Sequence, residues 1–414
     1  MTFRETSLKR VTRFAAGGTP SVAEPRFWSD DSGTPWVTIG DMTWQPAVRQ
    51  TERRLSEEGV ASKRLPVGRK GTVLFAMYAS VGAVSVLDTE ASWNQAILGM
   101  TPVPSLADRR FLVYWLLSLR PRLRELFRSN TQDNLNAEQV GNLPYPVLPV
   151  DRQQAISDFL DAETARIDAL IEKKRRMRQL LGERMAAHVE QKTHASSISA
   201  MEDDPLPERW RLAVLRRCFK LIQYGIGEAS REVGAIAVLG MGNVDHGEVV
   251  GNPGGFVDQV DPSLLLESGD LLFNRTNSLA LVGKVALVRD SMAATFASYL
   301  VRLRTNHLAD SAYLNYLLNT RPALEQARSM ALPSIGQANL NPSRYTSIRV
   351  PLPPVQIQRS IVSELDLEAG THDRLSSALV RQIDLLTEHR QALITAAVTG
   401  RVEIPGVGTW QANK

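Results

Sequence analysis

Apolar residues recur at heptad spacing in two long stretches of the chain. In the second half, the residues seven positions apart are Leu365, His372, Leu379, Leu386 and Leu393. A similar stripe in the first half comprises Leu160, Ile167, Leu170, Met177, Leu181 and Met185. Heptad spacing sustained over several turns is typical of coiled coils, whereas a helix packed along a globular core is the alternative. Because each half has one such helix, the pattern predicts that the two pair with each other, antiparallel.

The segments before each long helix contain short apolar runs bounded by Gly, Pro and Asp, which is typical of strands. These runs are 35–42, 71–78 and 82–88 in the first half, and 235–244, 270–275 and 283–290 in the second. An amphipathic helix is predicted next, at about 109–127 and again at 311–329. A polar loop and a proline-bounded strand then lead into the long helix. The predicted fold class is therefore α+β.

Several blocks of sequence occur twice, in the same order. PVDRQQAISDFL at 149–160 matches PVQIQRSIVSEL at 354–365, and QDNLN at 132–136 matches QANLN at 337–341. FLVYWLL at 111–117 resembles YLNYLLN at 313–319, and KGTVLF at 70–75 resembles SGDLLF at 268–273. The blocks keep the same order, and the distance along the chain between the two copies of a block varies by only a few residues. This pattern indicates a duplication. A duplicated chain suits a repeated partner, such as two DNA half-sites or a protein dimer.

The repeat predicts the domain organisation. Two duplicated globular domains are expected at 1–150 and 209–354, separated by the antiparallel pair of long coiled-coil helices. The remaining predicted segments are the first helix at 151–192, a polar linker at 193–208, the second helix at 355–400 and a tail at 401–414.

Composition excludes fewer classes of function than the repeat does. The net charge of +4 and pI of about 9.2 are compatible with nucleic-acid binding but do not establish it. The lone cysteine, Cys218, excludes an internal disulfide and a cysteine-based zinc site, and is expected in the core. No signal-peptide pattern or membrane-length apolar run is seen, so a cytoplasmic location without membrane contact is expected.

Catalytic motifs are missing from the sequence. A Walker A loop would need GxxxxGK[ST], which does not occur, and the six histidines form no HExxH pair. An adenine methyltransferase would need an Asn/Asp-Pro-Pro-aromatic motif, but NLPY at 142–145 differs at its second position. The GMG string at 240–242 lacks a third glycine, since Asp245 stands there. The chain is therefore predicted to have no catalytic centre and no cofactor of its own.

Several motifs together resemble the specificity subunit of type I restriction–modification systems. They are GGTPS (17–21), PWVTIGDM (35–42), ASWNQAIL (91–98), DLLFNRTNS with LVGK (270–284), the NLN loops and EHRQALITAAVTGRV (388–402). The resemblance covers essentially the whole chain. It departs where LIQYGIGEAS replaces GGTPS in the second half, so the two recognition domains are expected to read different sequences.

This resemblance implies a non-catalytic DNA-recognition subunit. Each target-recognition domain would read one half of a bipartite double-stranded DNA target, while the helices set the gap. Expected partners are two copies of an adenine-methyltransferase subunit and two copies of an ATP-dependent restriction subunit. S-adenosylmethionine, ATP and Mg would bind those partners and not this chain. The alternative is a coiled-coil protein–protein adaptor without DNA specificity.

Candidate DNA contacts are polar residues in strand-end loops. Arg, Asn and Gln read base edges, whereas Ser, Thr and Lys suit phosphates. The second-half candidates are Asn274, Arg275, Thr276, Asn277 and Ser278, which could instead cap their own backbone. The first-half candidates are Tyr78, Ser80, Asn94 and Gln95, of which the last two could equally be turn residues.

Two further polar features have competing interpretations. The basic run on the first long helix, Lys173, Lys174, Arg175 and Arg176, could contact phosphate or an acidic partner, although most such runs are solvated faces. The NLN loops recur with identical spelling in domains expected to read different DNA. Asn136 with Gln139, and Asn341 before Pro342, therefore predict helix N-caps and not base contacts.

Overall fold

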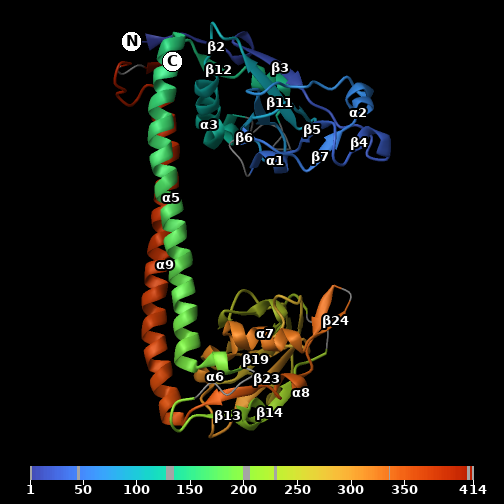
Figure 1. Ribbon diagram of the computed structural model, residues 1–414, viewed down its shortest axis with the longest axis vertical. Helices are drawn as coiled ribbons and strands as arrows, with labels where there is room; N and C mark the ends of the chain where they lie inside the picture. The colour runs from blue at the N-terminus through green and yellow to red at the C-terminus, as the bar shows by residue number, and fades with distance from the viewer. Residues whose placement is uncertain are drawn as a thin grey trace. The chain divides into compact units, whose positions relative to one another are not determined.

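The computed structural model describes residues 2–43, 47–126, 135–198, 206–227, 231–334, 336–407 and 411–412 (Figure 1). The chain divides into two compact units. Unit 1 consists of Met1–Arg175 and Val380–Lys414, and unit 2 is Arg176–Leu379. Each unit therefore contains one sheet-rich region together with a part of both long helices.

Unit 1 is built on two sheets. The five-stranded sheet has the order β3 (Thr12–Ala16), β11 (Ile97–Pro102), β8 (Val73–Ala76), β9 (Val84–Leu87), β6 (Ala47–Val48). The four-stranded sheet has the order β10 (Ser92–Trp93), β5 (Thr34–Val37), β7 (Arg53–Leu55), β4 (Trp28–Ser29). Two-stranded pairs join β2 (Glu5–Ser7) to β12 (Pro144–Pro146), and β1 (Thr2–Phe3) to β27 (Gln411–Ala412). Its short helical elements are η1 (Leu8–Arg10), η2 (Pro25–Phe27), α1 (Ile39–Thr43), α2 (Glu57–Ser62) and α4 (Ala137–Gly141).

Strand β8 shows how the core of unit 1 forms. All four of its residues are buried, because successive side chains point to opposite faces and both faces are covered. Phe75 packs into the cluster that includes Phe111 of α3 (Arg109–Leu126), whereas Leu74 packs into a second cluster with Val37. Ile394, from the second long helix, is fully buried in the first cluster.

Unit 2 repeats this strand order. Its six-stranded sheet runs β14 (Phe219–Tyr224), β23 (Leu300–Thr305), β19 (Leu271–Asn274), β21 (Val285–Leu287), β17 (Gly247–Val249), β16 (Val244–Asp245). Three-stranded sheets contain β18 (Gly255–Val257), β15 (Ile236–Leu239), β22 (Ala294–Phe296), and β20 (Thr276–Asn277), β25 (Gln337–Asn339), β24 (Leu332–Ser334). Strand β13 (Arg211–Val214) pairs with β26 (Arg349–Leu352). The short helical elements are η3 (Ala195–Ile198), η4 (Leu215–Cys218), η5 (Met241–Asn243), η6 (Pro262–Leu264) and α8 (Pro342–Tyr345).

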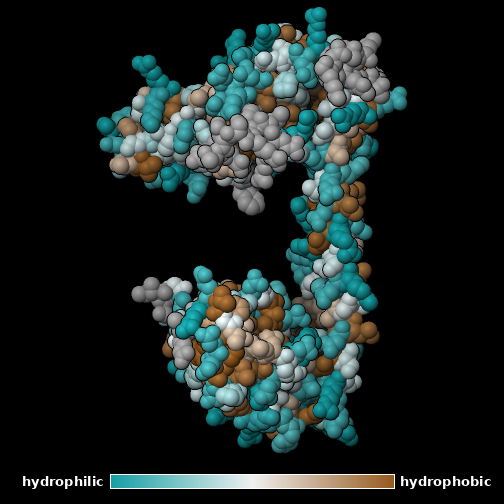
Figure 2. Space-filling view, turned by 180° about the vertical axis from the view of Figure 1, so that it is seen from behind, coloured by the Kyte–Doolittle hydropathy of each residue, from teal (hydrophilic) through white to brown (hydrophobic). Residues whose placement is uncertain are grey.

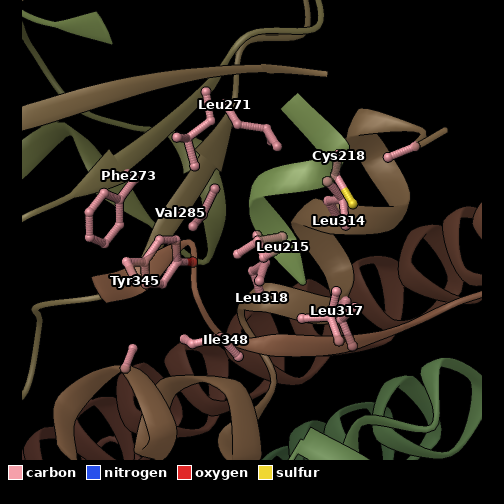
Figure 3. Close-up of a cluster of buried hydrophobic side chains, with 14 of the residues drawn as sticks. Leu215, Cys218, Leu271, Phe273, Val285, Leu314, Leu317, Leu318, Tyr345 and Ile348 are labelled. Atoms are coloured by element: carbon pink, nitrogen blue, oxygen red, sulfur yellow. The ribbon is translucent and has the colours of Figure 1, made fainter. Parts of the chain in front are cut away.

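The main core of unit 2 lies between its sheet and the helices (Figure 3). The rings of Phe273 and Tyr345 are stacked, with centroids 4.0 Å apart. Cys218 is fully buried in this cluster, which confirms the prediction that it is a core residue. Burial raises the pKa of its thiol to about 11, so the reactive thiolate is disfavoured.

Two predicted elements differ from the structure. The helix predicted at 311–329 is two helices, α6 (Ser311–Leu318) and α7 (Arg321–Ser329). Thr320 has extended backbone angles at the N-cap of α7 and Pro322 lies in its first turn, so a new helix starts there. The run 35–42 is also mixed, because β5 ends at Val37 and α1 begins at Ile39.

Both long helices are present, as α5 (Val150–Thr193) and α9 (Val355–Val398). They lie side by side within each unit (Figure 1). In unit 1, Asp168 pairs with Arg390 at 2.9 Å, and Lys174 donates to Gln382 at 2.6 Å. In unit 2, Lys192 pairs with Glu364 at 2.5 Å. Among the described residues, no helix is long and apolar enough to cross a membrane.

A buried glutamine anchors the start of each long helix. The Gln153 amide accepts from the Asp108 backbone N–H at 2.9 Å and donates to the Leu106 and Leu148 carbonyls. Gln358 accepts in the same way from Asp310 N–H at 2.7 Å. Its Nε2 donates to the carbonyls of Leu308 and Pro353. The two halves therefore use the same hydrogen-bond arrangement at equivalent positions.

The predicted linker and tail are partly packed. Residues 199–205 of the linker, and 408–410 and 413–414 of the tail, lie outside the described residues. Before the first of these gaps, Ala195 is fully buried in the unit 2 core. In the tail, Ile404 is 2% exposed in the unit 1 core.

Candidate nucleic-acid interface

The second-half candidates occupy the segment 274–278, from the last residue of β19 to the residue after β20, which we call the Arg275 loop. Not all of them lie at the surface. Asn274 is fully buried, and its Nδ2 donates to the Met241 carbonyl at 3.0 Å. Thr276 is 4% exposed, and its hydroxyl donates to Asn339 Oδ1 at 2.6 Å. These two side chains support the loop and would have to rearrange to reach DNA.

Arg275 lies at the surface edge of the same loop. Its guanidinium carbon is 5.4 Å from the centre of the Tyr224 ring, a cation–π distance. The guanidinium also donates to Asn339 Oδ1 and to the Ser298 carbonyl, each at 3.4 Å. Tyr224 is 49% exposed, so a cation lies beside an exposed aromatic ring. This combination is suited to a nucleic-acid surface.

At the end of the loop, Asn277 and Ser278 form a hydrogen bond with each other. Asn277 Oδ1 accepts from the Ser278 backbone N–H at 2.8 Å, which is the local capping considered from the sequence. Ser278 is exposed and Asn277 is half-buried, so both remain candidates for contact.

The equivalent first-half loop has a different character. Tyr78 packs against the unit 1 core, and Ser80 accepts at its carbonyl from Ala83 N–H in a tight turn. Ala79 between them has a positive φ of 58°. This turn presents less polar chemistry than the loop at 274–278.

Asn94 and Gln95 fall into different roles in the structure. Asn94 Oδ1 accepts from Ala96 N–H at 3.0 Å, so its side chain closes a turn. Gln95 is exposed, and its Oε1 accepts from the Thr19 hydroxyl.

A pocket beside Gln95 collects residues from three separate segments. Its lining comprises Ala16, Gly17, Gly18, Thr19, Lys63, Arg64, Leu65, Pro66 and Gln95. The GGTPS run can approach Gln95 because Gly17 has no side chain: a Cβ there would lie 2.2 Å from the Asn94 carbonyl oxygen. Lys63 and Arg64 were not singled out by the sequence, because they lie more than 30 residues from Gln95 in no recognisable motif.

Two side chains of the basic run on α5 interact with neighbouring helix residues, and the other two point to solvent. Lys174 is bonded to Gln382, and Arg175 forms an ion pair with Glu172 at 2.5 Å. Lys173 and Arg176 are exposed. Only part of the run is therefore free of helix contacts that would compete with phosphate.

Residues 3–177, which include the Gln95 pocket, match the family described as the type I restriction modification DNA specificity domain. The match lies within the first half of the 414-residue chain. Two relatives from Methanocaldococcus jannaschii are similar over shorter stretches. The MjaIX specificity subunit is 23% identical over 42% of this chain, and the putative MjaX specificity subunit is 22% identical over 47%. The matched stretches span 40% and 46% of those relatives, less than half of their length.

Solved structures resemble this chain over nearly all of its length. One, from work on complex assembly and conformational transition of the type I R-M system, aligns with a TM-score of 0.68 at 17% identity. The alignment covers 97% of this chain and 98% of that one. The HsdS subunit from Thermoanaerobacter tengcongensis aligns with a TM-score of 0.52 at 17% identity, covering 97% of each chain. These likenesses support the α+β fold.

Asn136 and Asn341, the last residues of the two NLN loops, are helix N-caps, as predicted. Asn136 and Gln139 form a reciprocal capping box at α4, with bonds of 2.8 and 2.9 Å. Asn341 accepts from Ser343 N–H at the start of α8.

Replacing Asn136 with alanine is expected to lower the free energy of unfolding by about 1 kcal/mol, because an N-cap bond is lost. DNA affinity of the folded protein should be unchanged. Urea denaturation and duplex titration measure the two effects, and Asn136→Ser, which retains capping, is the matched control. A loss of affinity in Asn136→Ala at full folding would show that the loop contacts DNA.

Proposed function

We propose that this chain is the DNA-specificity subunit of a type I restriction–modification complex. The observation that carries the proposal is that residues 3–177 match a DNA specificity domain while unit 2 repeats the same strand order. Two duplicated recognition domains, 1–150 and 209–354, would each read one half of a bipartite target. The distinct chemistry of the Gln95 pocket and the Arg275 loop favours different half-site sequences.

The proposed spacer is one antiparallel coiled-coil pair formed by α5 and α9. Within each unit, residues later in α5 contact residues earlier in α9, which supports the antiparallel direction. A helix of 44 residues spans roughly 66 Å at about 1.5 Å per residue. A pair of this length would set the gap between the half-sites.

The same helices are proposed to bind the partner subunits. Figure 2 shows apolar side chains along the helices among hydrophilic ones. The exposed apolar helix residues include Leu170, Met177, Leu180, Leu367, Leu375 and Leu385. Two adenine-methyltransferase subunits and two ATP-dependent restriction subunits are the proposed partners, which would bind S-adenosylmethionine, ATP and Mg. The chain itself would be non-catalytic and act in the cytoplasm.

The decisive experiment is to co-express the chain with its cognate methyltransferase in a methylation-free host and map methylated adenines by long-read sequencing. A split motif with a fixed gap, absent when the chain is omitted, is expected. No new methylation from a demonstrably assembled complex would favour the adaptor alternative. The adaptor would also lack salt-dependent duplex binding, which phosphate contacts produce by counterion release.

Arg275→Ala is expected to weaken binding of the assembled complex to its target duplex by about 5- to 150-fold, because a base or phosphate contact contributes about 1–3 kcal/mol. Arg275→Lys distinguishes a phosphate contact from a base contact. Compared with alanine, lysine should restore a phosphate contact but not the bidentate reading of guanine. Arg289→Ala, which removes an exposed arginine of the same unit, is the control. Unchanged affinity in folded Arg275→Ala would assign this arginine to loop packing alone.

A further inference from the structure

We propose that His188, Glu364 and Glu368 form a binding site for a divalent transition-metal ion, zinc in particular, that joins α5 to α9 within unit 2. One ligand atom from each residue lies within 4.8 Å of the others. The proposal concerns a site apart from the DNA-reading loops, and it does not rest on the proposed function.

The three side chains converge from two helices. Glu364 and Glu368 are four residues apart on α9, so they lie on the same helix face. His188 reaches them from α5, with its Nε2 3.2 Å from Glu368 Oε2. Residues from both helices would therefore bind the same ion.

The imidazole Nε2 faces a carboxylate oxygen without forming a hydrogen bond to it. Although Nε2 is close to Glu368, it is a buried atom with no hydrogen-bond partner among the described residues. The His188 side chain is 23% exposed, whereas Glu364 and Glu368 are 47% and 46% exposed. A buried nitrogen facing two accessible carboxylates leaves an open side where an ion could enter and keep a water ligand.

The backbone that holds these ligands is fixed by packing. Leu365, between the two glutamates, is fully buried, and Ile361 is 8% exposed in the same core. Val189, next to His188, packs against that core as well. The helices thus hold their separation without the ion, and only the flexible glutamate side chains need to move to close the site.

The donor set selects the kind of ion. One imidazole nitrogen with two carboxylates suits zinc or a neighbouring transition metal, whereas calcium and magnesium prefer oxygen ligands throughout. Zinc–ligand bonds of about 2.0–2.2 Å require the donor atoms to approach to roughly 3 Å from one another. Rotation of the two glutamate side chains can supply this movement.

Lys192 provides the sharpest prediction from this geometry. Its ammonium group is 2.5 Å from Glu364 Oε1, so it binds the same carboxylate that the ion would use. A metal ion would compete with this lysine for Glu364. Removing the ammonium group should therefore strengthen metal binding, a result that nonspecific surface binding would not produce.

The test is a zinc titration of the untagged full-length chain, stripped with chelator, against a fluorescent zinc indicator. We expect one ion per chain, and absorption of the cobalt-substituted protein should report nitrogen–oxygen coordination. His188→Gln and Glu368→Gln should each weaken binding by at least about tenfold, and Lys192→Met should tighten it several-fold. His372→Gln, which replaces a histidine of α9 outside the cluster, is the control.

Each outcome decides the proposal. Thermal melts and circular dichroism identify any variant that fails to fold, and Lys192→Met keeps the test valid because its predicted effect is a gain. Zinc binding that is unaffected in folded His188→Gln and Lys192→Met would overturn the site. Absence of stoichiometric binding to the wild-type chain would do the same and leave these residues as an ion-pair cluster.

Discussion

Replacing Asp270 with alanine is expected to lower the free energy of unfolding of unit 2 by about 3–5 kcal/mol, because it leaves a buried arginine without its counter-charge. Asp270 and Arg302 are each 1% exposed and 3.3 Å apart. Asp270 also receives two hydrogen bonds from Arg304, at 2.6 and 3.0 Å. A loss of this size is a large fraction of the free energy of unfolding of a typical protein, which is about 5–15 kcal/mol.

Hydrogen exchange measured peptide by peptide on the full chain separates unit 2 from unit 1, and urea denaturation gives the free energy. Asp258→Ala is the matched control, since its ion pair with Arg231 is exposed on both sides and should contribute less than about 1 kcal/mol. Asp270→Asn keeps the shape of the side chain, so its loss of stability should lie between those of Asp270→Ala and Asp258→Ala. Equal destabilisation by Asp270→Ala and Asp258→Ala would contradict this account.

The sequence predicted the elements around Asp270 but not its role. The apolar residues of the run 270–275 predict a strand, and β19 covers Leu271–Asn274 of that run, but the pattern assigns no role to Asp270. Its partners Arg302 and Arg304 lie on β23, which pairs with β19. Strand pairing sets which distant residues meet, and periodicity alone does not reveal it.

The same limit applies to the candidate interface. The polar loop was found from its composition, and Arg275 does lie next to the exposed ring of Tyr224. Which of its neighbours point inward was not predictable, and Asn274 and Thr276 are buried. Tyr224 and Asn339, which hold Arg275, come from β14 and β25 and gave no local signal.

The helix starts were more predictable because their chemistry is local. The NLN spelling predicted N-caps, and both caps are present because the capping bonds join residues two or three apart. The break in the helix at 311–329 shows the opposite case. Proline is found within α3 at Pro121 and in the first turn of α7 at Pro322, so its presence alone did not locate the break.

The repeat carries a prediction that reaches into both units. Gln153 and Gln358 are fully buried and stand at equivalent places in the two repeated blocks. Each satisfies one backbone N–H and two backbone carbonyls at the entry to a long helix. Gln153 also accepts from the Tyr145 hydroxyl at 2.9 Å. Such buried groups have no alternative partner when the amide is removed.

Gln153→Leu is therefore expected to destabilise unit 1, and Gln358→Leu unit 2, each by about 3 kcal/mol or more, since every buried polar group left unpaired costs about 1–3 kcal/mol. Urea denaturation with peptide-resolved hydrogen exchange assigns each loss to its unit. The controls are Gln154→Leu and Gln356→Leu, neighbouring exposed glutamines that should change stability by less than about 0.5 kcal/mol. Because the two networks share no partner, the double variant should lose the sum of the single effects. A large loss in one unit with none in the other would contradict an equivalent role for the two glutamines.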